Sequence, residues 1–129
     1  MADEAPKPPF DVKRHENFEY WYSNNFQFQP TESDLTIIFG QVDTTSGKPV
    51  IEQHTAMTLT WEQAKLLAHF LRVQVAGREM LYGRLQIPPP LWPSEPVQPT
   101  ADFMAQNPQA EGIIELFRRM REEFIATIR

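Results

Sequence analysis

The positions of the prolines limit where this chain can form regular secondary structure. Of 12 prolines in 129 residues, only Pro30 and Pro49 lie between residues 10 and 87, and seven crowd into residues 83–108. Proline fixes φ and has no backbone N–H, so a segment dense in proline cannot continue as a helix or a central strand. We therefore expect four parts: a flexible lead-in (1–16), a β-β-β-α domain (17–87), an extended proline-rich linker (88–109) and a C-terminal amphipathic helix (110–129).

Three segments of the domain alternate apolar and polar side chains, the period of two that is typical of half-buried strands. The first, residues 18–29, holds six aromatic rings in twelve positions, and residues 35–42 and 50–60 follow. Their short connections favour an antiparallel meander. A surface on which nucleic-acid bases stack would interleave the rings with basic residues, yet no Lys or Arg lies between Arg14 and Lys48. We therefore expect the rings to fill a core, with Trp21, which breaks the alternation, as an exposed contact residue.

At Thr60 the apolar period changes to that of a helix. Thr60 and Gln63 form a capping-box pattern, and apolar residues recur at helical spacing from Leu66 onward. Gly83 is the expected terminator, so the pattern predicts a helix over residues 61–82. The fold class we predict is α+β, a three-stranded antiparallel β-meander packed by one long helix, with a proline-rich arm and a C-terminal amphipathic helix.

Composition and motifs argue against several classes of function. The chain has no cysteine and a net charge of −5, which disfavours disulfides, thiolate chemistry and binding to a phosphate backbone. Its three histidines lack metal-ligand spacing, and there is no nucleophile or phosphate-binding motif. We predict no catalytic residue, no cofactor and no metal ligand. Without a signal-peptide pattern or an apolar run of about 20 residues, we expect a cytoplasmic protein that binds neither nucleic acid nor membrane.

The C-terminal helix carries an apolar stripe that should not face water unpaired. The stripe consists of Ile113, Phe117, Met120, Phe124 and Ile128. Two placements stay open, on the chain's own domain or on another chain. Trp21 and Trp92, the latter within a Pro-Pro-Pro-Leu-Trp-Pro run, are secondary contact candidates. We hypothesise a non-enzymatic interaction or assembly protein that forms a homo-oligomer, most simply a dimer.

The alternative hypothesis is a small-molecule binding or catalytic domain with a pocket on the aromatic face of the sheet. Four residues would line this pocket, namely Tyr20, Tyr22, Asn24 and His54.

Four short motifs in a fixed order resemble a bacterial family known as domain of unknown function 3467. They are Tyr22-Ser23-Asn24, Phe39-Gly40, Leu59-Thr60-x-x-Gln63-Ala64-Lys65-Leu66-Leu67 and Glu79-x-x-Tyr82-Gly83, which together span about half of the chain. Trp61 departs from the pattern, because such helices often begin with proline there. The resemblance implies a small β-meander-plus-helix domain and brings no known activity or catalytic residue.

Overall fold

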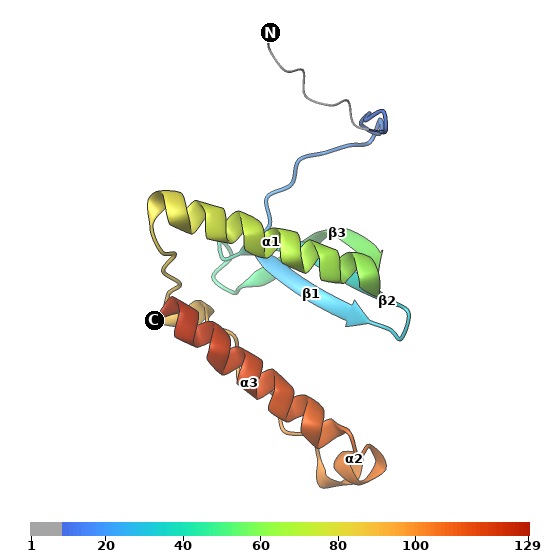
Figure 1. Cartoon of the computed structure of the whole chain (residues 1–129), viewed down its shortest axis with the longest axis vertical. Coiled ribbons are helices and arrows are strands. Elements are labelled where there is room, and N and C mark those ends of the chain that lie inside the picture. The colour runs from blue at the N-terminus through green and yellow to red at the C-terminus, as the bar shows by residue number, and fades with distance from the viewer. Residues whose placement is uncertain (1–8) are drawn as a thin grey trace. The chain divides into compact units, whose positions relative to one another are not determined.

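The computed structural model describes residues 9–129 and has the predicted α+β class (Figure 1). A three-stranded antiparallel sheet in the order β1-β2-β3 is followed by a long helix, as the change of period predicts. The part of the lead-in before residue 9 lies outside the described residues, and residues 9–24 contain turns but no helix or strand. The elements are β1 (Asn25–Pro30), β2 (Asp34–Asp43), β3 (Val50–Thr60), α1 (Trp61–Tyr82), the short 3-10 helix η1 (Pro89–Leu91), α2 (Ala101–Gln106) and α3 (Ala110–Ile128).

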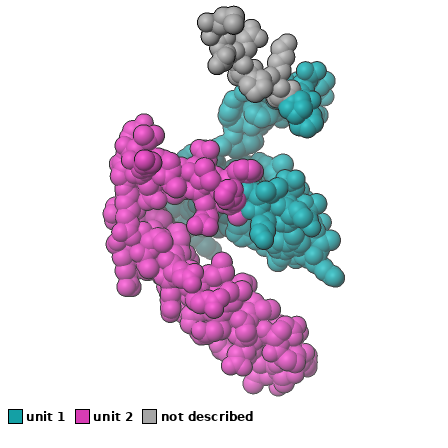
Figure 2. Space-filling view, in the orientation of Figure 1, with its two compact units in different colours: residues 1–67 teal, residues 68–129 magenta. Residues whose placement is uncertain are grey.

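The chain divides into two compact units, coloured separately in Figure 2. The first unit ends at Leu67 and contains the sheet together with the first turns of α1. The second unit, residues 68–129, contains the rest of α1, the proline-rich segment, α2 and α3. The division falls inside α1, so this helix contributes residues to both units.

Within the first unit, the register gives the sheet one apolar and one polar face. Phe26 pairs with Phe39 and Phe28 with Ile37, so these side chains share the apolar face. On the other face the amide of Gln53 donates to Gln27 at 2.9 Å, and the hydroxyls of Thr36 and Thr58 lie 2.8 Å apart. The ring of Phe26 meets that of Phe39 edge-on at 5.9 Å. Phe26 and Phe28 are nevertheless 57% and 60% exposed, so the apolar face is not a closed core.

The first strand is shorter than the alternation predicts, because hydrogen bonds at Ser23 and Asn24 turn the chain out of the ladder. The Ser23 hydroxyl and the Asn24 N–H both donate to the Gly40 carbonyl, at 2.9 and 3.1 Å. Asn24 Oδ1 accepts from the N–H of Val42 at 2.8 Å, in the place of a backbone carbonyl. These bonds satisfy the carbonyl of Gly40 and the N–H of Val42 in β2. The residues before Ser23 therefore do not continue the first strand.

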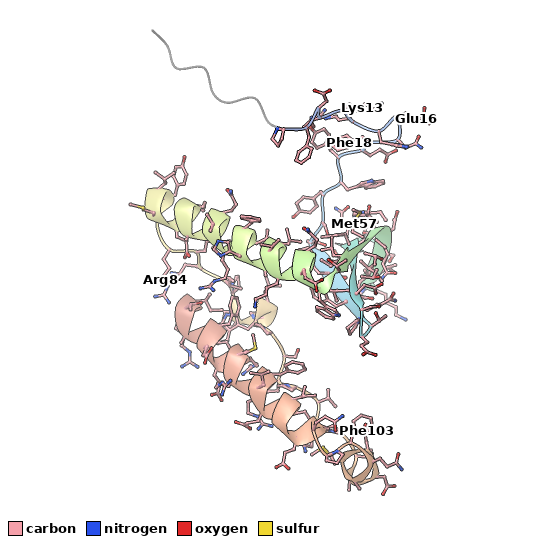
Figure 3. All side chains as sticks on the ribbon, turned by 45° about the vertical axis from the view of Figure 1, so that its right-hand side comes forward. Lys13, Glu16, Phe18, Met57, Arg84 and Phe103 are labelled. Carbon is pink, nitrogen blue, oxygen red and sulfur yellow. The ribbon has the colours of Figure 1, made fainter. Side chains whose placement is uncertain are left out.

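The rings before Ser23 do not fill a core, so that expectation is wrong for them. Tyr20 and Tyr22 are 79% and 69% exposed, and Phe18 is about half-exposed. The guanidinium of Arg14 lies over the rings of Phe18 and Tyr20, at 4.8 and 5.4 Å from their centroids. Phe18 is labelled in Figure 3 on the segment that precedes the sheet.

Gly40 marks a β-bulge between the two longer strands. Phe39 pairs with Thr55 whereas Gly40 pairs with Gln53, so His54 is an extra residue in β3. A Cβ at Gly40 would lie 2.9 Å from the carbonyl oxygen of Glu52 and 3.2 Å from Ile51 Cγ2. The close approach of the β3 backbone therefore requires glycine at this position.

Local signals in the sequence define both ends of α1. The hydroxyl of Thr60 accepts from the N–H of Gln63 at 3.2 Å, as the capping pattern predicts. At the other end, Gly83 has a φ of +95° and its N–H donates to the Glu79 carbonyl at 2.9 Å. The Glu79 carboxylate then accepts from the N–H of Leu85 at 2.9 Å. No residue of α1 is buried, and no helix among residues 9–129 is long and apolar enough to cross a membrane.

We predict opposite effects of adding a methyl group at two glycines. Gly40→Ala should lower the free energy of unfolding by about 1–3 kcal/mol, because the new Cβ would clash with the β3 backbone. Gly77→Ala, inside α1 with open space around its Cα, should raise that free energy by about 1 kcal/mol. Thermal unfolding followed by circular dichroism measures both. Equal stability of Gly40→Ala and the parent protein would contradict the bulge geometry.

Candidate interaction surface on the terminal helix

The apolar side chains of α3 lie on two adjacent sectors of the helix, which differ in what covers them. On the first sector Ala110, Ile125 and Ile128 are buried, at 5–7% exposure. Ile114, Arg118 and Arg121 on the same sector are partly buried. The chain's own proline-rich segment is bonded to this sector, because Arg121 donates to Pro93 and Glu95. One face of the helix therefore packs within its own chain.

Two arginines hold the proline-rich segment against α3. Arg84, labelled in Figure 3, donates from Nε to the Thr127 carbonyl at 2.6 Å and from Nη2 to the Ala126 carbonyl at 3.1 Å. The last carbonyls of a helix have no partner within the helix and carry its negative dipole end, so a guanidinium suits this place. Nearer the middle of α3, Arg121 donates to the Pro93 carbonyl at 2.7 Å and to the Glu95 carboxylate at 3.1 Å. The segment therefore runs back along the helix, antiparallel to it.

Trp92 is part of this packing. Its indole N–H donates to the Ile87 carbonyl at 2.8 Å, and the guanidinium of Arg129 lies 5.9 Å from the ring centroid. The side chain is partly buried, whereas the neighbouring Leu91 is 73% exposed. Trp92 thus stabilises the fold of the second unit, and Leu91 is the residue of this pair that faces outward.

The segment expected to run extended contains a short helix, α2. No proline lies between Pro99 and Pro108, so residues 100–107 are free to turn into a helix. Thr100 caps it, because its hydroxyl accepts from the N–H of Phe103 at 3.2 Å. The expectation of a continuously extended linker is wrong for this part.

The second sector of α3 is apolar and uncovered. It consists of five side chains that are 39–55% exposed, which we call the exposed stripe: Ile113, Leu116, Phe117, Met120 and Phe124. Gln109 and Thr127 continue the sector toward the two ends, so no charged side chain interrupts it over roughly 100° of helix circumference. Alternate spacings of four and three residues, from Ile113 through Phe117 and Met120 to Phe124, are those of a seam between two helices.

The structure changes the membership of the predicted stripe in two places. Ile128, the last member of the predicted stripe, is only 7% exposed and lies on the packed sector. At 3.6 residues per turn, Ile128 lies roughly 60° around the helix from Ile113 and roughly 20° beyond Phe117, at the border between the stripe and the packed sector. Leu116 takes part in the stripe instead. The helical period could have indicated Leu116. The burial of Ile128 depends on which sector of α3 the proline-rich segment covers, and the helical period does not contain that information.

A polar hollow lies in the first unit beside Trp21 and His54. The two rings stack with their centroids 4.5 Å apart and their planes 9° from parallel. His54 Nε2 lies 3.2 Å from the Tyr22 carbonyl oxygen, and its Nδ1 lies 3.0 Å from the Thr55 hydroxyl. The hollow has a volume of about 390 Å³, and its lining includes Trp21, Asp43, Glu52 and His54.

Chemically, this hollow is polar and acidic. The N–H and the hydroxyl of Thr45 donate to the Asp43 carboxylate and hold its pKa below the usual range, so Asp43 is ionised at neutral pH. Of the four residues expected to line a pocket, only His54 lies at the hollow, because Tyr20 and Tyr22 face solvent and the Asn24 amide binds Val42. Among residues 9–129 no three His, Asp or Glu side chains lie close enough together to bind a metal ion.

Comparison of the chain with protein-family models, with curated proteins and with solved structures gives no match.

We predict that the Arg121 contact stabilises the arm against α3. Arg121→Ala removes two hydrogen bonds from a side chain that is 22% exposed, at a cost of about 1.5–3 kcal/mol. The backbone amide of Trp92 should then exchange its hydrogen at least about tenfold faster. Arg119→Ala is the matched control, because Arg119 is 67% exposed and meets Glu123 only at 3.9 Å. Equal exchange rates in the two variants would contradict the proposed role of Arg121.

Proposed function

We propose that this protein is a non-enzymatic interaction and assembly protein that self-associates through the exposed stripe of α3. The observation that supports this most strongly is the pairing of a packed sector and an open sector on one helix. The arm fixes α3 through its buried sector, with Arg84 and Arg121 bonded to backbone carbonyls. The stripe is thereby presented on a helix that is already ordered, which lowers the entropy cost of binding.

The composition of the stripe fits a protein partner. Phe117, Met120 and Phe124 supply aromatic and thioether groups, which are enriched at the centres of protein interfaces. Arg119 and Glu123 lie at one border of the stripe and carry opposite charges. A border of mixed sign allows two copies of the same helix to approach without net repulsion.

The size of the stripe limits the strength of the contact. Five side chains that are about half-exposed present on the order of 450 Å² of apolar surface per chain. A standard interface buries about 800 Å² per partner. The stripe by itself therefore supports a weak dimer, and a stable assembly needs additional surface.

We also propose that residues 22–83 are related to the family that their motifs resemble. In support, the motif residues have local structural roles: Ser23 and Asn24 bind Gly40, Thr60 caps α1, and Glu79 with Gly83 ends it. Such roles would constrain these residue types in any chain with this meander and helix.

The test of self-association is a charge at the centre of the stripe. Phe117→Asp should weaken the dimer by about 30-fold or more, because an interface centre that loses a buried aromatic residue loses about 2 kcal/mol. Light scattering coupled to size-exclusion chromatography, over a dilution series, measures the change. Phe117 is 54% exposed, so the folded monomer should tolerate the substitution.

Glu122→Asp is the matched control, because it places aspartate in the same helix on the charged side. It should leave the dilution series unchanged. A parent protein that is monomeric at every concentration, or equal weakening by the two variants, would overturn the proposal.

A further inference from the structure

The outer edge of β3 is a second surface that the described chain leaves unpaired. In the order β1-β2-β3, one side of β3 pairs with β2, and no strand among residues 9–129 pairs with its other side. A free edge presents a row of N–H and C=O groups to any other strand. Proteins commonly protect such edges with charges, prolines or bulges.

Only the first half of β3 carries such protection. The bulge at His54 interrupts the ladder, Trp21 stacks on the His54 ring, and Glu52 places a charge nearby. The second half, Thr55–Thr60, contains no charged residue, no proline and no glycine. It is a regular run of six residues that pairs with residues 34–39 of β2. Six residues are a usual strand length for a stable pairing.

The edge of β1 is less suited to pairing. β1 ends at Pro30, which has no N–H to donate. At its start, the chain leaves the ladder through the Asn24 and Ser23 contacts with Gly40. β3 is longer, with 11 residues, and continues directly into α1.

We propose that Thr55–Thr60 of one chain pairs antiparallel with the same segment of a second copy, which joins two sheets into one of six strands. A twofold axis brings identical segments together, so every free donor of one copy meets an acceptor of the other. Charge also favours a second copy. Glu52, the single charged residue of β3, lies outside the paired segment and does not face its own counterpart.

Pairing also preserves the two faces of the sheet. Met57 and Leu59 lie on the apolar face, and Met57, labelled on β3 in Figure 3, is 53% exposed. Thr58 lies on the polar face with Thr36. The second copy, paired antiparallel, places its own Met57 and Leu59 on the same face of the joined sheet, so the apolar face continues across the interface.

This edge is distinct from the exposed stripe of α3. Two different symmetric interfaces on one chain connect copies into assemblies larger than a dimer. The edge therefore supplies the additional interface area that a stable assembly needs beyond the stripe. Its pairing can be measured in the Phe117→Asp variant, in which the stripe contact is weakened.

The absence of cysteine in the parent chain allows a clean cross-linking test. Single cysteines are introduced at each position from Thr55 to Thr60 in the full chain that already carries Phe117→Asp. Under oxidising conditions one position should form most of the disulfide-linked dimer, because directly opposed residues share a face and the twofold axis therefore passes between one pair of equivalent residues. The reason is geometric: equivalent residues separate by roughly 6–7 Å with each step from the twofold axis, whereas a disulfide needs Cβ atoms about 4 Å apart.

Two cysteine controls show whether the cross-link belongs to this edge. Thr36→Cys on the central strand and Gln29→Cys on β1 should not cross-link. A maximum at Gln29 in place of β3, equal yields at all eight positions, or no cross-link at any position would each overturn the proposal.

A charge on the edge gives an independent measurement. Ala56→Lys in the Phe117→Asp background should convert the remaining dimer to monomer, as judged by light scattering, whereas Gln29→Lys should not. Circular dichroism verifies that each variant keeps its sheet.

If Phe117→Asp alone is already monomeric and gives no cross-link, edge pairing is wrong and the stripe accounts for association. If the parent and Phe117→Asp are equally dimeric with a β3 maximum, the stripe proposal is wrong and edge pairing stands.

Discussion

The second unit depends on the capture of backbone carbonyls by two arginines. Arg84 binds the carbonyls at the end of α3, and Arg121 binds Pro93 and Glu95 in the arm. A proline-rich segment has few N–H groups with which to pair, so a side-chain donor such as Arg121 can attach it to a helix through its carbonyls. Because these bonds fix which sector of α3 the arm covers, they also fix which sector stays open for a partner.

The first unit depends on a similarly local constraint at Gly40. Its carbonyl accepts from Ser23 and Asn24, and its missing Cβ lets the β3 backbone approach closely. The resulting bulge at His54 divides β3 into a protected half and a regular half. One glycine thus limits both the length of β1 and the part of β3 that is available for pairing.

Periodicity predicted the element types well because period two and period 3.6 reflect backbone geometry alone. It also located α1 to the residue, since Thr60 and Gly83 act through bonds within a single turn. It failed where distant residues compete for the same groups. The alternation of Phe18, Tyr20 and Tyr22 looks like a strand, but Gly40, far along the chain, draws Ser23 and Asn24 out of the ladder.

The sequence by itself determined the α+β class, the order of the three strands and of α1 and α3, the ends of α1 and the amphipathic character of α3. Only the tertiary structure decided that Ile128 is buried, that Leu116 joins the exposed stripe, and that Trp92 packs inward. The physical reason is the range of the interactions. Propensity, capping and periodicity act within one or two turns, whereas the covered side of a helix depends on a segment that returns from far along the chain.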